Sequence, residues 1–335
     1  MDVTKTFWNR GVDMRKYNVL ITGVGAIIGY GLINSLRNSK YDVHIVGMDI
    51  YEDAYGQYIC DEFIQAIPAS DEEYPAFVKN IIKEKKIDLV MFGTEQEIHR
   101  LIHEKEVMGE DYAKLVINNQ MIVEMSNDKW STYEFLIKNN LDAIPSYIDG
   151  EYEELVEKIG SPFLLKPRRS YASKGIEKIH NREEFEFFKK RVGDQFMVQT
   201  IVGDVEHEYT VATFGLGDGS CVKPIIMKRK LSQEGATAKA TVIDCKKMEE
   251  QVYKMVELLQ PIGPTNFQFR YHNGKYLLLE TNPRISSSTS LRAAFGYNEA
   301  EMCIDFFVNK ERPKETQIKK GTAVRYIADC VQIQC

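Results

Sequence analysis

The segment 266–284 reads NFQFRYHNGKYLLLETNPR, and its pattern predicts a β-hairpin. Phe267 and Phe269 alternate with polar residues, as in a strand with one buried face, and residues 276–279 form a second, apolar strand. Residues 272–274, His-Asn-Gly, supply the turn between them. The rest of the chain is interpreted from this hairpin outward.

Four polar side chains stand at matched positions of the hairpin: Gln268, Glu280, Asn282 and Arg284. A hairpin can bring Gln268 close to Glu280, and the residues two and four positions after Glu280 point to the same face while the chain stays extended. That face would hold oxygen ligands beside a guanidinium. Mg²⁺ prefers one or two protein carboxylates together with phosphate oxygens and water, and an Arg beside it suits a phosphoryl group in transfer. The alternative is a surface hairpin with a salt bridge.

Composition limits the class of protein. The length of 335 residues predicts two or three domains. The net charge of -6 argues against general nucleic-acid binding, and no apolar run approaches the roughly 18 residues of a membrane span. The six cysteines form no CxxC pair and predict reduced thiols in the cytoplasm. Residues 1–16 lack the apolar core of a signal peptide and are expected to be a loose leader.

The segment 17–49 opens a doubly wound α/β unit, because an apolar strand, a glycine-rich turn, a helical pattern and a second strand follow one another. Gly23, Gly25 and Gly29 allow a tight turn and let backbone N–H groups face an anion at the helix start. A dinucleotide fold with Asp49 on the ribose is the alternative. Its support is weak, since the spacing is GxGxxxG and not GxGxxG.

The α/β pattern continues with a helix at 75–86 and strands at 87–93 and 114–118. Thr94 is expected to cap the helix that follows the first of these strands. Glu95 lies at the carboxyl end of that strand, where ligands of such sheets bind. Glu95 is therefore a candidate substrate residue, and a capping box at the helix start is the alternative.

Two lysines in the middle of the chain occupy positions that favour the binding of an anion. A helix at 126–140 has Lys129 in its first turn, which is unfavourable for the helix dipole and hints at an anionic partner. An apolar strand from Pro162 places Lys166 at its end, and a loop of small and basic residues follows at 168–175. A strand, a lysine and such a loop suit the cradling of a triphosphate. The alternative for the loop is an ordinary basic turn.

The next strands offer contacts for a nucleoside. The apolar strand 196–202 is interrupted by Gln199, and its last residues can supply an apolar slot and backbone hydrogen bonds for adenine. Glu208, on the following strand, can take the ribose hydroxyls. A further strand at 221–231 ends in basic residues that include Arg229.

Together these motifs resemble the ATP-grasp superfamily. Their order is Lys129, PFLLKP with Lys166, a small-residue loop, QTIVGDVEHEYTV, a basic strand and NFQFRYHNGKYLLLETNPRISSSTSL. The nearest resemblance is to the ATP-binding halves of the carbamoyl phosphate synthase large subunit and to stand-alone proteins similar to it. It covers roughly residues 17–307, and LLLETNPR after NFQFR is its most specific part.

The resemblance implies an α/β preATP-grasp domain of the Rossmann-like kind, followed by a two-lobed α+β ATP-grasp fold. The implied boundaries are 1–120 for the first domain, 121–195 for the small lobe and 196–335 for the large lobe with the metal site.

The resemblance also implies the residues of the site. The catalytic side chains would be Arg284, Lys166 and Arg229. The ligands of Mg²⁺, with Mn²⁺ as an alternative, would be Gln268, Glu280 and Asn282. The ATP contacts would be Lys129, Lys166, Ser170, Ser173, Gly175, Gln199, Thr200, Ile201, Val202 and Glu208.

Four positions depart from the family pattern. The loop over the phosphates has a single glycine, Gly175, which predicts a stiffer loop. Gln199 stands where a Glu is usual, although its oxygen can still accept a hydrogen bond. Gln268 stands where many members have Glu, although the carbamoyl phosphate synthase type also carries Gln there. One fewer carboxylate predicts weaker Mg²⁺ binding. Ala212 replaces an acid, and we have no account of that change.

The resemblance implies an ATP-dependent carboxylate–amine ligase. Phosphorylation would turn a small-molecule carboxylate into an acyl phosphate, and a small-molecule amine would attack it to give an amide, ADP and phosphate. The alternatives are a carboxylate or bicarbonate kinase of the carbamoyl phosphate synthase type, a non-catalytic nucleotide sensor and, third, a dinucleotide oxidoreductase.

The segment 285–291, ISSSTSL, bears on the substrate because it is rich in hydroxyls and opens a helix. Ser287 can present its hydroxyl and N–H to an anion, and Arg292 is a candidate partner for a second substrate carboxylate. The alternative is a capped helix start. The sequence names neither the acid nor the amine, and a homodimer is an assembly that the resemblance allows.

Overall fold

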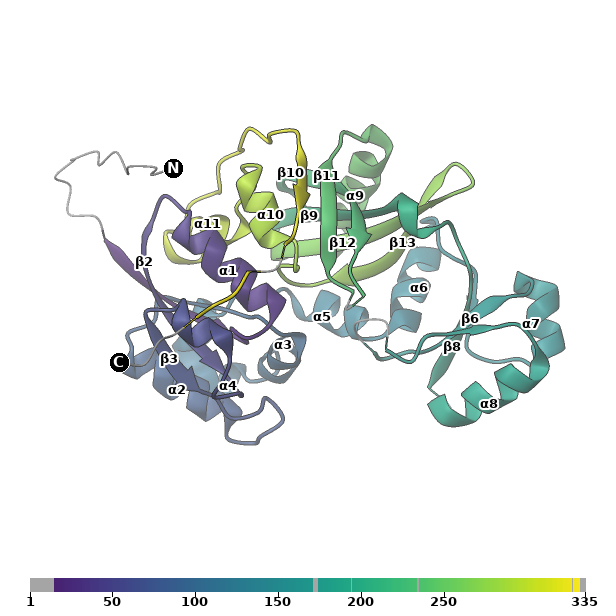
Figure 1. The fold of residues 1–335 in the computed structure, drawn as a ribbon, viewed down its shortest axis with the longest axis horizontal. Helices are drawn as coiled ribbons and strands as arrows, with labels where there is room; N and C mark the ends of the chain where they lie inside the picture. Colours follow the sequence, from purple (N-terminus) through teal and green to yellow (C-terminus); the bar gives the residue numbers. More distant parts are fainter. Residues whose placement is uncertain (1–14, 171–173, 194, 234, 327, 332–335) are drawn as a thin grey trace.

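The computed structural model describes residues 15–170, 174–193, 195–233, 235–326 and 328–331. These residues form three β-sheets: one parallel sheet of four strands, one antiparallel sheet of four strands and one antiparallel sheet of six strands. Figure 1 shows the small antiparallel sheet at one end of the molecule and the parallel sheet at the other, with the six-stranded sheet above them.

The parallel sheet has the strand order β3-β2-β1-β4. Its central strand β1 is an apolar run that is buried over most of its length, as expected where helices cover both faces of a parallel sheet. The predicted strand at 114–118 is absent, because only Leu115 forms a bridge, with Val90. The elements are β1 Lys16–Thr22, α1 Ile27–Arg37, β2 Asp42–Asp49, β3 Glu62–Gln65, α2 Tyr74–Glu84, β4 Leu89–Met91, α3 Glu95–Leu101 and α4 Lys105–Met108, with 3₁₀ turns at Tyr55–Tyr58 and Gly109–Lys114.

The small antiparallel sheet has the order β5-β8-β6-β7 and packs on two helices through Leu155, Phe163, Phe185 and Val198. Because β8 pairs with β6 along its length, this lobe continues past the predicted boundary at 195. The elements are β5 Ser146–Tyr147, α7 Tyr152–Ile159, β6 Phe163–Pro167, β7 Glu177–Ile179, α8 Arg182–Val192 and β8 Phe196–Thr200.

The predicted helix at 126–140 is part of a pair, α5 Gln120–Asn127 and α6 Lys129–Lys138. Asp128 separates them and caps α6, since its carboxylate accepts a hydrogen bond from the backbone N–H of Trp130. Apolar side chains of both helices, Ile122 and Leu136 among them, pack on the six-stranded sheet, while Asp128 between the helices forms an ion pair with Arg168 of the small lobe.

The six-stranded sheet has the order β13-β12-β9-β10-β11-β14. The predicted hairpin is confirmed, because Gln268 lies opposite Glu280 and Asn273 and Gly274 form a two-residue turn with positive φ angles of 47° and 83°. The elements are β9 Glu208–Leu216, β10 Cys221–Leu231, β11 Thr237–Val242, α9 Lys246–Leu259, β12 Ile262–His272, β13 Lys275–Asn282, α10 Thr289–Ala294, α11 Glu299–Cys303, a π-helical turn Ile304–Val308 and β14 Thr322–Val324, with a 3₁₀ turn at Val205–His207.

Helix α9 was not predicted, although its sequence carries the signal. Met248, Val252, Met255, Val256 and Leu259 recur at helical spacing and are all buried.

Two findings bear on the environment of the protein. None of the helices formed by the described residues is long and apolar enough to cross a membrane. The cysteines at 60, 221, 245, 303 and 330 are free thiols.

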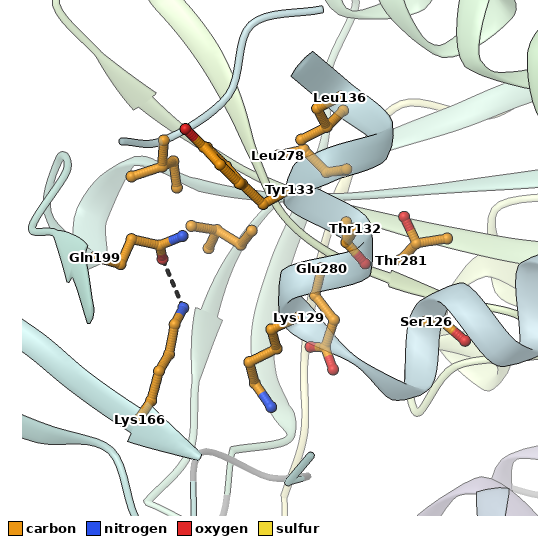
Figure 2. A pocket seen from close by; sticks show the side chains of 12 residues that line it. Ser126, Lys129, Thr132, Tyr133, Leu136, Lys166, Gln199, Leu278, Glu280 and Thr281 are labelled. Carbon is orange, nitrogen blue, oxygen red and sulfur yellow. Dashed lines mark hydrogen bonds between the residues drawn. The ribbon is translucent and has the colours of Figure 1, made fainter. Parts of the chain in front are cut away.

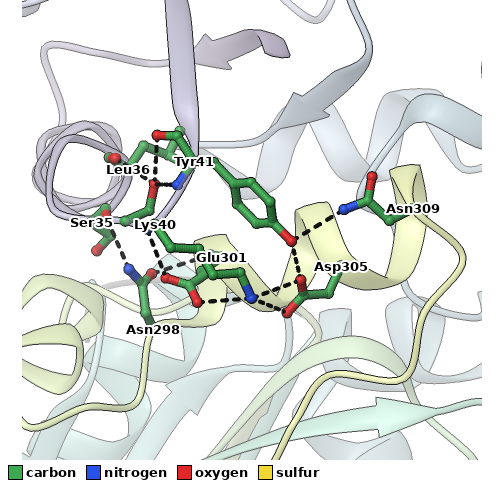
Figure 3. Close-up of polar contacts among 9 residues, drawn as sticks. Ser35, Leu36, Lys40, Tyr41, Asn298, Glu301, Asp305 and Asn309 are labelled. Atoms are coloured by element: carbon green, nitrogen blue, oxygen red, sulfur yellow. Dashed lines mark hydrogen bonds and ion pairs between the residues drawn. The ribbon is translucent and has the colours of Figure 1, made fainter. Parts of the chain in front are cut away.

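A polar cluster joins the parallel sheet to the helices that follow the six-stranded sheet (Figure 3). Lys40, after α1, forms ion pairs with Asp305 at 3.0 Å and with Glu301 at 3.2 Å. The Tyr41 hydroxyl donates to the same Asp305 carboxylate, and Asn309 donates to that hydroxyl at 3.1 Å. Burial alone would lower the pKa of Lys40, but its bonds to Asp305 and Glu301 outweigh that effect and raise it. The cluster therefore fixes how the first domain sits on the large sheet.

We predict that Asp305→Asn lowers the free energy of unfolding by about 1–3 kcal/mol, because Lys40 and the Tyr41 hydroxyl lose a buried ionic acceptor. Urea denaturation followed by circular dichroism would measure the change. Asp42→Asn, at the exposed start of β2, is the matched control and should leave the midpoint unchanged. Equal midpoints for the two variants would show that the cluster contributes nothing to stability.

Candidate active site

A cavity of about 370 Å³ opens where the end of the hairpin faces the parallel sheet. Strands β10, β12 and β13 line one side of it, and the loops after β1 and β4 line the other. It brings together most of the residues predicted for catalysis, metal binding and substrate: Glu95, Arg229, Gln268, Glu280, Asn282, Arg284 and Ser287.

A second, narrow cavity of about 30 Å³ lies between α6, β13 and the small lobe (Figure 2). Lys129, Lys166 and Gln199 supply its polar wall, and Leu278 and Leu279 are among its apolar residues. In Figure 2, Lys129 is seen between Lys166 and Glu280. The structure thus gathers predicted nucleotide-binding residues from two lobes around one space.

Glu280 lines both cavities. Its carboxylate has no hydrogen bond or ion pair within the part of the chain that the structure describes. Burial raises the pKa of Glu280, and the negative charge of Glu95 adds to this effect, while Arg284, Lys129 and Arg229 oppose it. A partly buried carboxylate without a hydrogen-bond donor is costly, so this position suits a bound cation.

The predicted metal ligands fit a cation only in part. Asn282 lies beside Glu280 in the larger cavity, and its Oδ1 accepts a hydrogen bond from Arg284 Nη2 at 3.0 Å. Gln268 Oε1 accepts from Arg229 Nη2 at 2.6 Å, so this oxygen is already bonded. No group of three His, Cys, Asp or Glu side chains suitable for a metal occurs among the described residues. One free carboxylate with amide oxygens beside it agrees with a Mg²⁺ that is held mainly by phosphate.

Lys166 is held at the end of β6 by a short chain of hydrogen bonds. Its Nζ donates to Gln199 Oε1 at 2.6 Å, and Gln199 Nε2 donates to Ser146 Oγ at 2.9 Å. Burial, reinforced by the positive charge of Lys129, lowers the pKa of Lys166 to about 8. The amide of Gln199 neutralises none of this charge, which remains available for an anion.

Lys129 binds the start of the loop that was predicted to cover the phosphates. Its Nζ donates to the Ser170 carbonyl at 2.8 Å and to Ser170 Oγ at 3.0 Å. Burial is the largest cause of the lowered pKa of Lys129. Ser173 lies outside the described residues. Gly175 has a φ of +73°, and a Cβ there would approach the Pro167 ring at 3.0 Å.

The predicted adenine segment follows β8. Val202 is buried in an apolar cluster with Ile144, which itself lines the narrow cavity. Thr200 ends β8, and its backbone N–H donates to the Pro145 carbonyl at 3.0 Å. Ile201 comes next and is partly exposed. Of residues 199–202, only Gln199 lines the narrow cavity, whose apolar wall includes Ile144, Leu278 and Leu279.

Glu208 does not lie where a ribose contact requires it. Its carboxylate is buried, accepts from Arg229 Nη2 at 2.8 Å and from Arg270 Nη2 at 2.6 Å, and lines neither cavity. The cause is the register of the sheet, which places Arg229 and Arg270 on the strands to either side of Glu208. Burial lowers the pKa of Arg229, and Glu208 offsets part of that shift.

The prediction that Arg292 pairs with a substrate carboxylate is wrong. Arg292 is fully buried and forms an ion pair with the equally buried Glu299 at 3.1 Å. Its Nη2 also donates to Thr210 Oγ1 at 2.8 Å and to Asn266 Oδ1 at 2.5 Å. All of these partners lie in the protein interior, so Arg292 stabilises the large lobe and cannot reach a ligand.

Arg284 and Glu95 meet across the larger cavity, with Arg284 Nη2 at 2.6 Å from Glu95 Oε1. The capping-box alternative for this helix is not formed, because the Thr94 hydroxyl donates to the Glu97 carboxylate at 2.8 Å and caps no backbone N–H. Glu95 is therefore directed into the cavity by an ion pair between residues far apart in the sequence.

The glycine-rich loop after β1 does not suit a dinucleotide. The Gly25 backbone N–H donates to Asp49 Oδ2 at 2.8 Å, and the Tyr51 N–H donates to Asp49 Oδ1 at 3.1 Å. A carboxylate thus takes the N–H group that a pyrophosphate would need, and it would repel that anion.

Comparison with known proteins supports the predicted resemblance. Residues 194–330 match the family described as ATP-grasp in the biosynthetic pathway with Ter operon. The large chain of carbamoyl phosphate synthase from Thermotoga petrophila is 21% identical, over 91% of this chain and 30% of that protein. The chain therefore spans about 30% of the length of the curated relatives that it matches first.

Solved structures show the same fold. N5-carboxyaminoimidazole synthetase from Staphylococcus aureus, complexed with ADP, superposes with a TM-score of 0.72 at 20% identity, over 92% of this chain and 82% of that one. The biotin carboxylase domain of 2-oxoglutarate carboxylase from Hydrogenobacter thermophilus, with MgADP, ADP and bicarbonate, gives 0.71 at 14% identity, over 91% and 73%. The predicted resemblance to the ATP-grasp superfamily and its two-lobed fold are confirmed.

We predict that ATP binds more weakly as the pH rises above about 8, by up to about tenfold per pH unit, because Lys166 must take up a proton to meet the phosphates. The affinity falls as the pH rises because the lowered pKa leaves the Lys166 side chain uncharged above about pH 8 in the absence of ATP. Calorimetric titration with a non-hydrolysable ATP analogue, from about pH 7 to about pH 9.5, would measure it.

Lys166→Arg keeps the positive charge throughout this pH range, so the affinity of this variant for the ATP analogue should change little with pH. Lys138→Arg, at the exposed end of α6, is the control and should keep the wild-type profile. An affinity that does not change with pH in the wild type would contradict a phosphate contact through Lys166.

Proposed function

We propose that this ATP-grasp protein is an ATP-dependent carboxylate–amine ligase that forms an amide through an acyl phosphate and releases ADP and phosphate. One observation carries the proposal. The carboxylate of Glu280 has no partner among the described residues and lies between a cavity with two lysines and a cavity with Arg284 and Asn282. A cationic nucleotide site thus adjoins a site that can bind a reacting carboxylate.

The nucleotide is proposed to enter from the side of the small lobe. Lys129 and Lys166 would contact its phosphates, Ser170 and Gly175 would flank the covering loop, and residues 199–202 would hold the adenine. Glu208 is left out of this set because two arginines occupy its carboxylate. The parallel sheet would be the Rossmann-like preATP-grasp domain that precedes the two lobes.

Mg²⁺ is proposed to be held by Glu280 and Asn282, with Gln268 joining them when its amide turns away from Arg229. When bound, the ion would neutralise charge on the phosphate oxygens and help to align them. The reduced ligand set predicts a site that binds metal together with ATP and only weakly without it.

The protein side chains then have distinct tasks. Arg284, fixed by Glu95, would bind the carboxylate of the acid and stabilise the phosphoryl group as it transfers. Ser287 lies on the same wall and can donate a hydrogen bond to the acid. Arg229 would act on the same charge from β10. An amine attacks the acyl carbon, the C–O bond to phosphate breaks, and phosphate leaves with the electron pair.

A second candidate is a bicarbonate or carboxylate kinase of the carbamoyl phosphate synthase type. The similarity to carbamoyl phosphate synthase large chains favours it, as does the structural neighbour that holds bicarbonate with MgADP. Its product would be an acyl or carbamoyl phosphate, and its turnover would need no amine.

We expect ³¹P NMR of the protein with Mg·ATP to show ADP and phosphate only when pooled carboxylates and pooled amines are both present. A phosphorylated acid formed without amine would support the kinase instead. AMP and pyrophosphate would contradict the acyl phosphate, and ATP binding without turnover in any pool would favour a nucleotide sensor.

We also predict that Glu280→Gln or Arg284→Ala lowers turnover by about 100-fold or more while ATP still binds, since each removes charge stabilisation at the transferring group. Coupled ADP release and calorimetric titration would measure the two effects. Glu257→Gln, exposed on α9, is the control and should match the wild type. Unchanged turnover in both site variants would remove these residues from the mechanism.

A further inference from the structure

A further cavity is lined by loops of the parallel sheet, and none of the residues assigned above to ATP, metal or the acid lines it. It has a volume of about 660 Å³ and lies at the carboxyl ends of the four parallel strands, where such sheets bind ligands. The loops after β1, β2, β3 and β4 all contribute to its wall.

The wall of this cavity is apolar and aromatic, with acids and no base. Ile50, Tyr51 and Tyr55 line it with exposed fractions of 44%, 65% and 38%, beside Ile67 and Pro68. Large apolar side chains that stay exposed in one concave surface are typical of a binding site.

The charged groups in the wall are all carboxylates: no Lys, Arg or His is among the described lining residues. Two of the three are already bonded, since Asp49 accepts backbone N–H groups and Glu97 accepts from Thr94 and Tyr74 hydroxyls. Asp53 is exposed and has no hydrogen bond or ion pair within the described chain. Asp53 is therefore the acid that can pair with a ligand.

This cavity adjoins the proposed catalytic cavity. Ala26, Thr94 and Gln96 line both spaces, so a molecule bound over the parallel sheet can reach the side where Glu95, Glu280 and Arg284 lie. Gln96 is uncharged and stands between an acidic space and one that contains arginines.

We propose that this cavity is the binding site of the amine substrate, and that it selects amines with an apolar or aromatic body. The inference rests on the ligase function proposed above and names the class of its second substrate. The apolar body would lie against Tyr51, Ile50 and Tyr55, and Asp53 would attract the ammonium form during entry. Anionic ligands are disfavoured because the wall offers carboxylates and no cation.

The chemistry balances with this placement. The ammonium first loses a proton to solvent, and the neutral nitrogen advances past Gln96 and forms the new C–N bond with the acyl carbon. The C–O bond to phosphate breaks, and phosphate departs with that electron pair. The second proton of the attacking nitrogen passes to the departing phosphate, so the products are the amide and hydrogen phosphate.

The first test is a binding measurement that needs neither ATP nor turnover. Saturation-transfer NMR on the full chain would compare phenethylamine with 3-phenylpropionate, which has a similar body and the opposite charge. We expect saturable binding of the amine and none of the acid in this cavity. Asp53→Asn and Tyr51→Ala should each weaken amine binding by about fivefold or more. Asp42→Asn, exposed at the opposite end of β2, is the control and should bind like the wild type.

Acid binding that Tyr51→Ala weakens as strongly as it weakens amine binding, or amine binding unaffected by both variants, would overturn the proposal. The two proposals fail separately. Amine binding through Asp53 without ATP turnover would reject the ligase and keep the amine site. Amine-dependent turnover whose KM for the amine is the same in Asp53→Asn, Tyr51→Ala and wild type would keep the ligase and reject this site.

Discussion

The carboxylate of Glu280 is the constraint on which the site depends. It is enclosed by β13, α6 and the loop after β4, and burial raises its pKa. Lys129 and Arg284 lie near enough to attract it, but neither forms a hydrogen bond or ion pair with it among the described residues. A partly buried charge in this state is stabilised by a bound cation or by a proton. The hairpin therefore places between the two cavities a carboxylate that a bound cation would stabilise.

The basic side chains around Glu280 differ in whether a carboxylate already pairs with them. This difference distinguishes the arginine side of the site from the lysine side. Arg229 is paired with Glu208, and Arg284 is paired with Glu95. Among the described residues, Lys129 and Lys166 donate only to uncharged oxygens, those of Arg168, Ser170 and Gln199. The lysine side thus carries uncompensated positive charge and suits a polyphosphate, whereas the arginine side suits a single carboxylate or a phosphoryl group that displaces an existing partner.

The sequence predicts contacts between residues that are close together along the chain, and it misses contacts between residues that are far apart along the chain. The pairing of Gln268 with Glu280 followed from strand alternation and an Asn-Gly turn, both of which act within a few residues. The ion pair of Arg284 with Glu95 joins two domains, and no local pattern reveals it. Glu208 was assigned to the ribose from its strand position and the family resemblance, and Arg292 was assigned to a second substrate carboxylate from its charge near the hydroxyl-rich segment. Each is instead paired in the interior, and burial of this kind depends on strand order and register, which the sequence did not indicate.

Under the proposed function, the arrangement of charge would keep the two substrates apart before they react. The nucleotide side is cationic, the cavity over the parallel sheet is acidic, and Thr94 and Gln96 form an uncharged boundary between that cavity and the catalytic one. An anionic acid and a cationic amine would otherwise attract each other and bind in mixed orientations. Separate electrostatic fields would hold each proposed substrate on its own side. Phosphorylation would then remove the negative charge of the acid's carboxylate group, and deprotonation would remove the charge of the amine. Only the two neutral reacting centres can then meet at the boundary without a large desolvation cost.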